Sequence, residues 1–313
     1  MADQTLGTLH SFLQKNNTQT SSGGTVVSYS HDTGSGPVLC AVHGYPQSSY
    51  MWRHLAPLLK DKISLFIPEQ PGYGISSLPP SYDKRVVGGL VMEALHRVFG
   101  KDRPVIWCGH DRGARLGHRL LVDRDPSHNI QAAILMDIVP TLVQYQVFSN
   151  PKASVAYFHW PFLATDLAPT MLEAMGGGYF CNLTLKKIKG GNEEGVKRFQ
   201  ADYAWDHYSH QFNNPECIAG SCGDYKWGAT GEPEAQEADQ KAGKKVKVPT
   251  LVIYSAANLG RMHNVSAVWK DWVEGELKCH GVEDGYGHFL PEECPEVIAK
   301  DVLEWIEHVG KAS

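Results

Sequence analysis

Short apolar runs alternate with helix-length amphipathic segments along most of this chain. The runs are nearly uninterrupted by polar residues, which is typical of strands buried on both faces of a parallel sheet. They occupy residues 38–42, 63–67, 104–108, 132–136, 250–254 and 277–282. Helices are expected at residues 84–99, 112–121, 265–272 and 295–309. This order predicts an α/β fold with a mostly parallel, doubly wound sheet, in which residues 25–29 begin an antiparallel edge.

The alternation stops between about residues 141 and 244. This stretch is rich in aromatic residues, glycine and asparagine, and it ends in an acidic tract at residues 231–239. It is too long for a plain connection between two strands. We therefore expect a mostly helical cap at 141–244, inserted in a core made of residues 1–140 and 245–313. A cap over the strand ends would close a pocket and exclude water.

Charge and composition exclude several classes of protein. The chain has 34 acidic and 29 basic residues and no long basic run, which argues against nucleic acid as a partner. No apolar stretch reaches the roughly 18 residues that span a membrane, and residues 1–20 lack the apolar core of a secretory signal. The seven cysteines are scattered without metal or redox spacing. A cytoplasmic protein without disulfides is the expectation.

The most informative stretch is residues 105–115, Val-Ile-Trp-Cys-Gly-His-Asp-Arg-Gly-Ala-Arg. An apolar strand runs into a Gly-x-Asp-x-Gly turn, and a helix follows at once. This is the pattern of a nucleophile elbow, with Asp111 at the position of the attacking residue. The start of a helix favours a negative charge, so Asp111 can stay ionised and nucleophilic. The alternative is an aspartate that only caps the helix, which is common at such junctions.

Two further segments stand where an elbow needs them. The segment His43-Gly44-Tyr45-Pro46 directly follows the strand at 38–42. The backbone N–H groups of Tyr45 and Arg112 are therefore expected to form an oxyanion hole. His288 lies on a glycine-flanked loop between the last strand and the final helix, where this arrangement places its general base. The chain has 15 histidines, and this place before the final helix is the reason for choosing His288 among them.

The general base also needs an acid to orient it. The strand at 250–254 leads into Ser255-Ala256-Ala257-Asn258, which offers no carboxylate. The strand at 132–136 is followed directly by Asp137. A lone aspartate there is usually a turn residue. Because the other position is vacant, we expect Asp137 to be the acid.

At residues 109–120, Gly-His-Asp-Arg-Gly-Ala-Arg-Leu-Gly-His-Arg-Leu, the chain resembles the fluoroacetate dehalogenases, a branch of the haloalkane dehalogenase and epoxide hydrolase group with the α/β-hydrolase fold. The likeness runs through nearly the whole chain, including residues 43–47, 137–141, 157–164 and 224–226. The resemblance implies Asp111 as nucleophile, Asp137 as acid and His288 as base.

The same resemblance implies how a substrate is held. Arg112 and Arg115 would bind a substrate carboxylate, a task to which the guanidinium group is suited. The residues expected to stabilise the leaving halide are His159, Trp160 and Tyr225. The implied reaction is hydrolysis of the carbon–halogen bond of a small 2-haloacid without metal or organic cofactor. The implied assembly is a homodimer.

Departures from the family pattern leave the substrate open. Glu69-Gln70 stands where the family has an acidic residue and arginine, and Gly223 precedes Asp224 where a glutamate is expected. An epoxide hydrolase is the nearest alternative, with Tyr225 and a second cap tyrosine as the acid, for which the candidates are Tyr157, Tyr179, Tyr203 and Tyr208. A binding protein derived from a hydrolase is the alternative from another class, but it would have no need to keep Asp111, Asp137 and His288 together.

Overall fold

The computed structural model describes residues 5–312, and the first four residues of the segment tested for a secretory signal lie outside this range. An eight-stranded sheet with the order β1-β2-β4-β3-β5-β6-β7-β8 forms its centre. The strands are β1 (Gln14–Gln19), β2 (Thr25–His31), β3 (Val38–Val42), β4 (Ser64–Pro68), β5 (Val105–His110), β6 (Ile130–Met136), β7 (Thr250–Ser255) and β8 (Leu277–Val282). β2 pairs antiparallel with β1 and β4, and all other pairs are parallel. The predicted mostly parallel sheet is confirmed.

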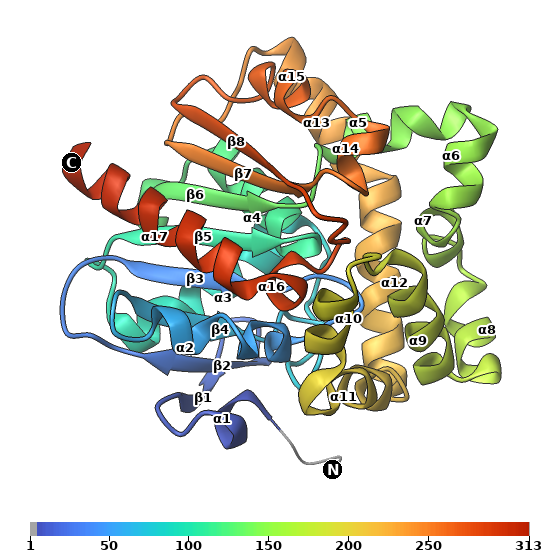
Figure 1. Ribbon diagram of the computed structural model, residues 1–313, viewed down its shortest axis with the longest axis horizontal. Coiled ribbons are helices and arrows are strands. Elements are labelled where there is room, and N and C mark those ends of the chain that lie inside the picture. Colours follow the sequence, from blue (N-terminus) through green and yellow to red (C-terminus); the bar gives the residue numbers. More distant parts are fainter. Residues whose placement is uncertain (1–4, 313) are drawn as a thin grey trace.

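Helices cover both faces of the sheet. Alternate residues of a strand point to opposite faces. In β3, Leu39 and Ala41 therefore join the core under α17, while Val38 and Val42 join the core under α3 and α4. Figure 1 shows α17 in front of the strands. The helices outside the cap are α1 (Leu6–Leu9), α2 (Ala56–Leu59), α3 (Lys84–Phe99), α4 (Arg112–Asp123), α14 (Leu259–Met262), α15 (Val265–Lys270), α16 (Leu290–Glu293) and α17 (Pro295–Ala312), with 3-10 turns η1 (Ser49–Arg53) and η2 (Pro126–His128).

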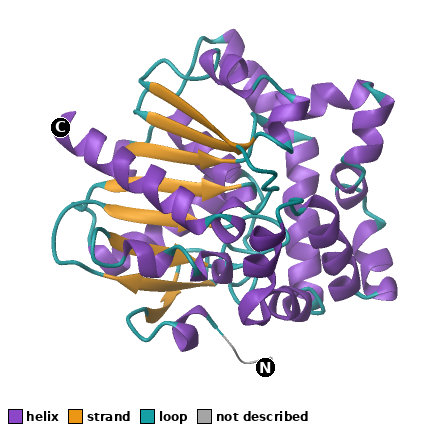
Figure 2. Ribbon diagram, in the orientation of Figure 1, coloured by secondary structure: helices purple, strands orange, loops and turns teal. Residues whose placement is uncertain are grey.

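Residues 141–241 form a run of helices between β6 and β7. They comprise α5 (Thr141–Gln146), α6 (Pro151–Ala156), α7 (His159–Leu163), α8 (Ala168–Met175), α9 (Gly177–Ile188), α10 (Glu193–Gln200), α11 (Ala204–Gln211), α12 (Pro215–Ala229) and α13 (Gly231–Lys241), with 3-10 turns η3 (Val147–Ser149) and η4 (Ala201–Tyr203). We call this run the cap. It forms a helical layer beyond the end of the sheet to which the arrowheads of β5 and β6 point (Figure 2).

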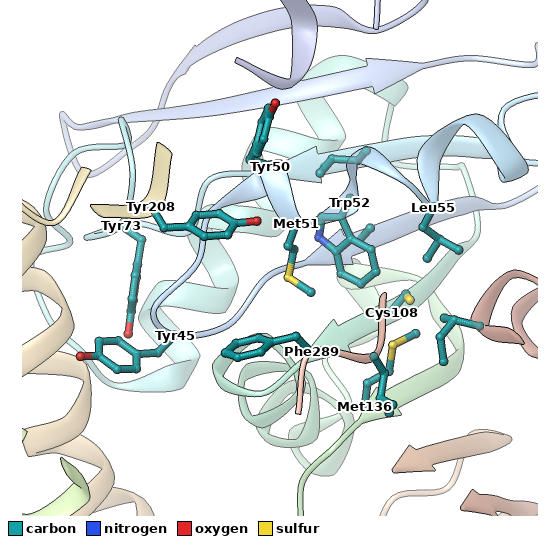
Figure 3. Close-up of a cluster of buried hydrophobic side chains, with 14 of the residues drawn as sticks. Tyr45, Tyr50, Met51, Trp52, Leu55, Tyr73, Cys108, Met136, Tyr208 and Phe289 are labelled. Atoms are coloured by element: carbon teal, nitrogen blue, oxygen red, sulfur yellow. The ribbon is translucent and has the colours of Figure 1, made fainter. Parts of the chain in front are cut away.

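The cap and the sheet layer share one hydrophobic core. Figure 3 shows part of it, where Tyr45, Tyr73 and Phe289 of the core elements gather with Tyr208 of the cap. The acidic tract of the sequence is α13, and it too is packed. Its Asp239 is buried and accepts a hydrogen bond of 2.5 Å from Arg119 on α4. The cap is thus fixed to the core by both apolar and ionic contacts.

The predicted helices differ from the observed ones mainly at their ends. Residues 84–99 form α3 as predicted, α4 and α17 continue further than expected, and α15 ends two residues early. β1 was not predicted, because its polar sequence Gln-Lys-Asn-Asn-Thr-Gln has no apolar periodicity. Within residues 5–312, no helix combines the length and the apolar character needed to cross a bilayer.

Candidate active site

Asp111 sits at a sharp turn between β5 and α4. Its backbone has φ 46° and ψ −113°, a conformation that non-glycine residues rarely adopt. The turn depends on close approach of the backbone. A Cβ on Gly109 would lie 2.4 Å from the carbonyl oxygen of Gly113, and a Cβ on Gly113 would lie 2.2 Å from that of Val42. Backbone strain of this kind clusters at active sites.

The two carboxylate oxygens of Asp111 have different surroundings. Oδ1 accepts a hydrogen bond of 2.9 Å from the backbone N–H of Tyr45. Oδ2 lies 3.9 Å from Nε2 of His288. Burial alone would raise the pKa of Asp111, but the charges of His288, Arg115 and Arg112 outweigh it and lower the pKa. The carboxylate is therefore ionised, and among the described residues its one hydrogen bond comes from the loop that follows β3.

Asp137 follows β6 with a left-handed backbone (φ 53°) that turns its side chain toward the last loop. Its Oδ1 accepts a hydrogen bond of 2.8 Å from the N–H of Ser255, and its Oδ2 lies 2.6 Å from Nδ1 of His288. Since a carboxylate can only accept, Nδ1 of His288 carries a proton and Nε2 is free to face Asp111.

The protonation of His288 depends on several neighbours. Burial lowers its pKa, but the hydrogen bond and charge of Asp137 outweigh burial. The charges of Asp111 and Glu293 act in the same direction, and the pKa of His288 lies above its ordinary value. His110 also reaches this loop, because its Nε2 lies 2.8 Å from the carbonyl oxygen of His288. Burial lowers the pKa of His110 to about 3, so this neutral ring donates to the carbonyl.

A small cavity of about 50 Å³ adjoins the nucleophile and the base. One water needs roughly 10–15 Å³ measured this way, so the space suits a molecule of only a few heavy atoms. Its lining comes from both the core and the cap: Tyr45, Asp111, Arg115, Asp137, Gln144, Tyr157, His159, Trp160, Ile188, Tyr225, Asn258, Leu259 and His288.

The two arginines that follow the nucleophile have different environments. Arg115 lines the cavity, and its Nη1 donates to the carbonyl oxygen of Val139 and to Oγ1 of Thr141. Its Nε is buried and has no hydrogen-bond partner within residues 5–312. The guanidinium also lies 4.5 Å from the centre of the Trp160 ring. Arg115 can thus offer a donor to a bound anion.

Arg112 does not line the cavity, unlike the expectation from the sequence. Its Nε donates over 2.5 Å to Oδ2 of Asp224, and its Nη2 donates to the carbonyl oxygen of the same residue. Asp224 is buried and also accepts from Lys84 and from the hydroxyl of Tyr73. The positive charge of Arg112 is compensated by this carboxylate, since a buried charge without a partner is costly. Only Nη1 of Arg112 is left without a partner in the described chain.

The three residues expected to hold a leaving group all line the cavity from the cap. His159 and Trp160 begin α7, and Tyr225 lies on α12. Burial lowers the pKa of His159 to about 3 and raises that of Tyr225 well above its ordinary value. Both side chains are therefore neutral at physiological pH, and each carries a proton that it can donate in a hydrogen bond.

Sequence reasoning did not single out Gln144 or Asn258 as lining residues, and named Tyr157 only as one of several cap tyrosines. Asn258 follows β7, so its position at a strand end was a usable signal. Gln144 lies on α5 and its Nε2 is buried without a partner in the described chain, which only the packing reveals. Within residues 5–312 no group of three or more histidine, cysteine or acidic side chains is placed to hold a metal ion.

Comparison with known proteins agrees with the fold and with the predicted resemblance. Residues 37–295 match the family model of the alpha/beta hydrolase fold. A fluoroacetate dehalogenase of Burkholderia sp. is 31% identical, with 87% of this chain and 88% of that protein aligned. Epoxide hydrolase A of Mycobacterium tuberculosis is 26% identical, with 86% of this chain and 90% of that protein aligned.

Solved structures extend the comparison. A provisionally assigned α/β hydrolase of Nostoc sp. PCC 7120 superposes with a TM-score of 0.83 at 30% identity, covering 95% of this chain and 99% of that one. A mutant of a provisionally assigned epoxide hydrolase from Pseudomonas aeruginosa gives a TM-score of 0.85 at 26% identity, covering 96% of this chain and 97% of that one. This chain belongs to the α/β-hydrolase family and is a hydrolase related to the fluoroacetate dehalogenases and epoxide hydrolases.

Proposed function

We propose that the enzyme hydrolyses the carbon–halogen bond of a small 2-haloacid through an ester on Asp111. The observation that carries this proposal is a cavity of about 50 Å³ lined both by the ionised nucleophile and by Arg115, a cationic donor to which no carboxylate within residues 5–312 is hydrogen-bonded. The donor matches one carboxylate, and the volume matches a two-carbon acid. The similarity to a fluoroacetate dehalogenase supports the same substrate class.

In the first step, Oδ2 of Asp111 attacks the carbon that bears the halogen. A new carbon–oxygen bond forms and the carbon–halogen bond breaks, so that the halide leaves with the bonding electron pair. His159, Trp160 and Tyr225 donate hydrogen bonds to the departing anion. Because His159 and Tyr225 are neutral, they stabilise the developing charge without losing a proton.

In the second step, Nε2 of His288 takes a proton from water, and the hydroxide attacks Cγ of the Asp111 ester. The carbonyl oxygen of the ester is the former Oδ1, which already accepts from the N–H of Tyr45. Negative charge therefore develops on an atom that has a fixed donor. The bond between Cγ and the ester oxygen then breaks, and the departing oxygen takes the proton back from Nε2 of His288, which releases a 2-hydroxy acid. The oxygen from water stays in the Asp111 carboxyl group, which loses its proton to solvent.

Epoxide hydrolysis is the second candidate, and one observation favours it. Tyr157 and Tyr225 both line the cavity, and burial raises the pKa of Tyr157 to about 12. Two protonated phenols beside the nucleophile can supply the proton that an opening epoxide ring needs. Several relatives are epoxide hydrolases.

Trapping the ester tests both candidates. In His288→Asn, water is no longer activated, so an alkyl group should accumulate on Asp111 and be visible in the intact mass. An adduct from chloroacetate or fluoroacetate supports the dehalogenase, and an adduct only from a small aliphatic epoxide supports the alternative. The matched control is His280→Asn, since His280 pairs with Asp301 away from the cavity. Absence of any adduct would refute nucleophilic catalysis by Asp111.

Labelled water gives an independent check. During one turnover in water containing oxygen-18, the label should enter the Asp111 carboxylate and be absent from the first product molecule. Direct attack of water on the substrate would put the label in the product at once. The homodimer and the cytoplasmic location expected from the sequence stay predictions, which light scattering and cell fractionation can test.

A further inference from the structure

The loop that carries His288 is bound to the cap by its backbone. The N–H of His288 donates over 3.1 Å to the carbonyl oxygen of Ile188, at the end of α9. Gly191 and Asn192 donate to the carbonyl oxygen of Gly285 over 2.9 and 3.2 Å. We call residues 284–289 the histidine loop and residues 188–192 the cap loop. Because Ile188 lines the cavity, the pairing joins the base to the wall of the substrate site.

The carboxylate of Glu293 lies at the junction of these two loops. From the histidine loop, Gly287 donates to Oε2 over 2.7 Å and Phe289 donates to Oε1 over 3.4 Å. From the cap loop, the N–H of Gly190 lies 3.1 Å from both oxygens. The side chain is completely buried. Both of its oxygens are thus used to hold backbone amides of the two loops together.

The junction leaves no space for larger groups. A Cβ on Gly190 would lie 2.4 Å from Oε2 of Glu293 and 2.4 Å from the nitrogen of Gly287. Such distances are too short for real contacts, so any side chain at Gly190 would push the loops apart. The close approach of the loops and the burial of the carboxylate therefore depend on each other.

We propose that Glu293 is a positioning residue for the second step, which holds His288 in line with the ester by clamping the histidine loop to the cap loop. The proposal rests on the proposed two-step function. Loss of the Glu293 clamp should therefore slow the hydrolysis of the ester and leave the attack by Asp111 unchanged. Attack by Asp111 needs the turn before α4 and the N–H of Tyr45, neither of which Glu293 touches, whereas hydrolysis needs the ring of His288 to be placed against Cγ.

Glu293→Gln tests the clamp with little change in shape. The amide replaces one acceptor oxygen by an NH₂ group, which would face a backbone N–H with donor against donor. In single turnovers with enzyme in excess over chloroacetate, quenched samples give chloride release for the first step and decay of the alkyl-enzyme mass for the second. We expect the first rate to stay within about twofold of the wild type and the second to fall by up to roughly 100-fold.

Glu296→Gln is the matched control. Glu296 also joins the core to the cap, through a 2.9 Å ion pair with Arg198, but this pair is exposed, and within residues 5–312 the Glu296 carboxylate accepts no hydrogen bond from the histidine loop. Both rates should equal those of the wild type. Gly190→Ala disturbs the same clamp from the cap side and should repeat the defect of Glu293→Gln, so that the test stands even if Glu293→Gln does not fold.

Hydrogen exchange gives a readout that does not depend on the substrate. Glu293→Gln should speed exchange in peptides that cover both the histidine loop and the cap loop, while Glu296→Gln should not. Equal slowing of both steps in Glu293→Gln and Gly190→Ala, or no slowing in either, overturns the proposal. Failure of the proposed function looks different, because wild-type enzyme would then release no chloride while the exchange result would still report on the clamp.

Discussion

Replacing Asp224 by asparagine should destabilise the protein strongly, because two buried cations depend on this carboxylate. Lys84 and Arg112 are at most 2% exposed, and both donate to it. Breaking a buried ion pair by removing one partner costs about 3–5 kcal/mol, since the other charge remains buried and unpaired. The isosteric amide keeps one acceptor, so we place the expected loss at the lower end, about 3 kcal/mol.

Urea unfolding followed by tryptophan fluorescence measures this loss at pH 7. Asp166→Asn is the matched control, because Asp166 pairs with Lys226 of the same helix α12 in an exposed ion pair. The control should leave the unfolding midpoint unchanged, as is usual for surface substitutions. Equal midpoints for Asp224→Asn and the control would show that the buried charges do not depend on Asp224 and would refute the reasoning.

The pH dependence of the loss provides a second check. Burial would raise the pKa of Asp224, but Arg112 and Lys84 together hold it far below its ordinary value. A lowered pKa contributes stability above the unfolded-state pKa, about 3.9, and this stability is lost as the pH falls toward the folded-state pKa. The difference between wild type and Asp224→Asn should therefore be constant from pH 7 to about 5 and shrink below about pH 4.

Three further predictions concern catalysis. Arg115→Met should raise KM for a haloacetate by roughly 10- to 100-fold, the value of one hydrogen bond to a charged group, and steady-state kinetics measure it. Asp137→Asn should move the acidic limb of the hydrolysis rate to lower pH, because His288 acts as a base only when neutral and Asp137 raises its pKa; an unmoved limb in single-turnover pH profiles would contradict this. Tyr157→Phe should abolish ring opening of an epoxide and leave dehalogenation of chloroacetate nearly unchanged, which parallel assays of both substrates would reveal.

The sheet could be predicted from the sequence because parallel strands are buried on both faces. The runs at residues 38–42 and 250–254 are apolar without interruption, and both became strands. β1 could not be recognised, since its residues are mostly exposed and its place depends on backbone pairing with β2. Local apolar pattern thus identifies central strands and fails for a polar edge strand.

The positions of Asp111, Asp137 and His288 follow from connectivity. Each stands directly after a strand or on the last loop, and the carboxyl ends of parallel strands meet at one edge of a sheet. The ion pair of Arg112, in contrast, could not be predicted from the order of strands and loops. Its partner Asp224 lies in the cap, and nothing in the order of the chain shows that α12 brings this carboxylate to α4. The ion pair between α12 of the cap and α4 of the core was therefore beyond sequence reasoning.

The division between the two arginines also bears on the choice between the candidate substrates. Asp224 compensates Arg112, whereas within residues 5–312 no carboxylate hydrogen-bonds to Arg115. A bound haloacid could place its carboxylate against the guanidinium of Arg115, which lines the cavity, but a neutral epoxide gives this buried donor group no anionic partner. An unsatisfied buried donor costs about 1–3 kcal/mol, more when it is charged. The enzyme should accordingly prefer a small anion over a neutral epoxide of the same size by roughly 10- to 100-fold in kcat/KM.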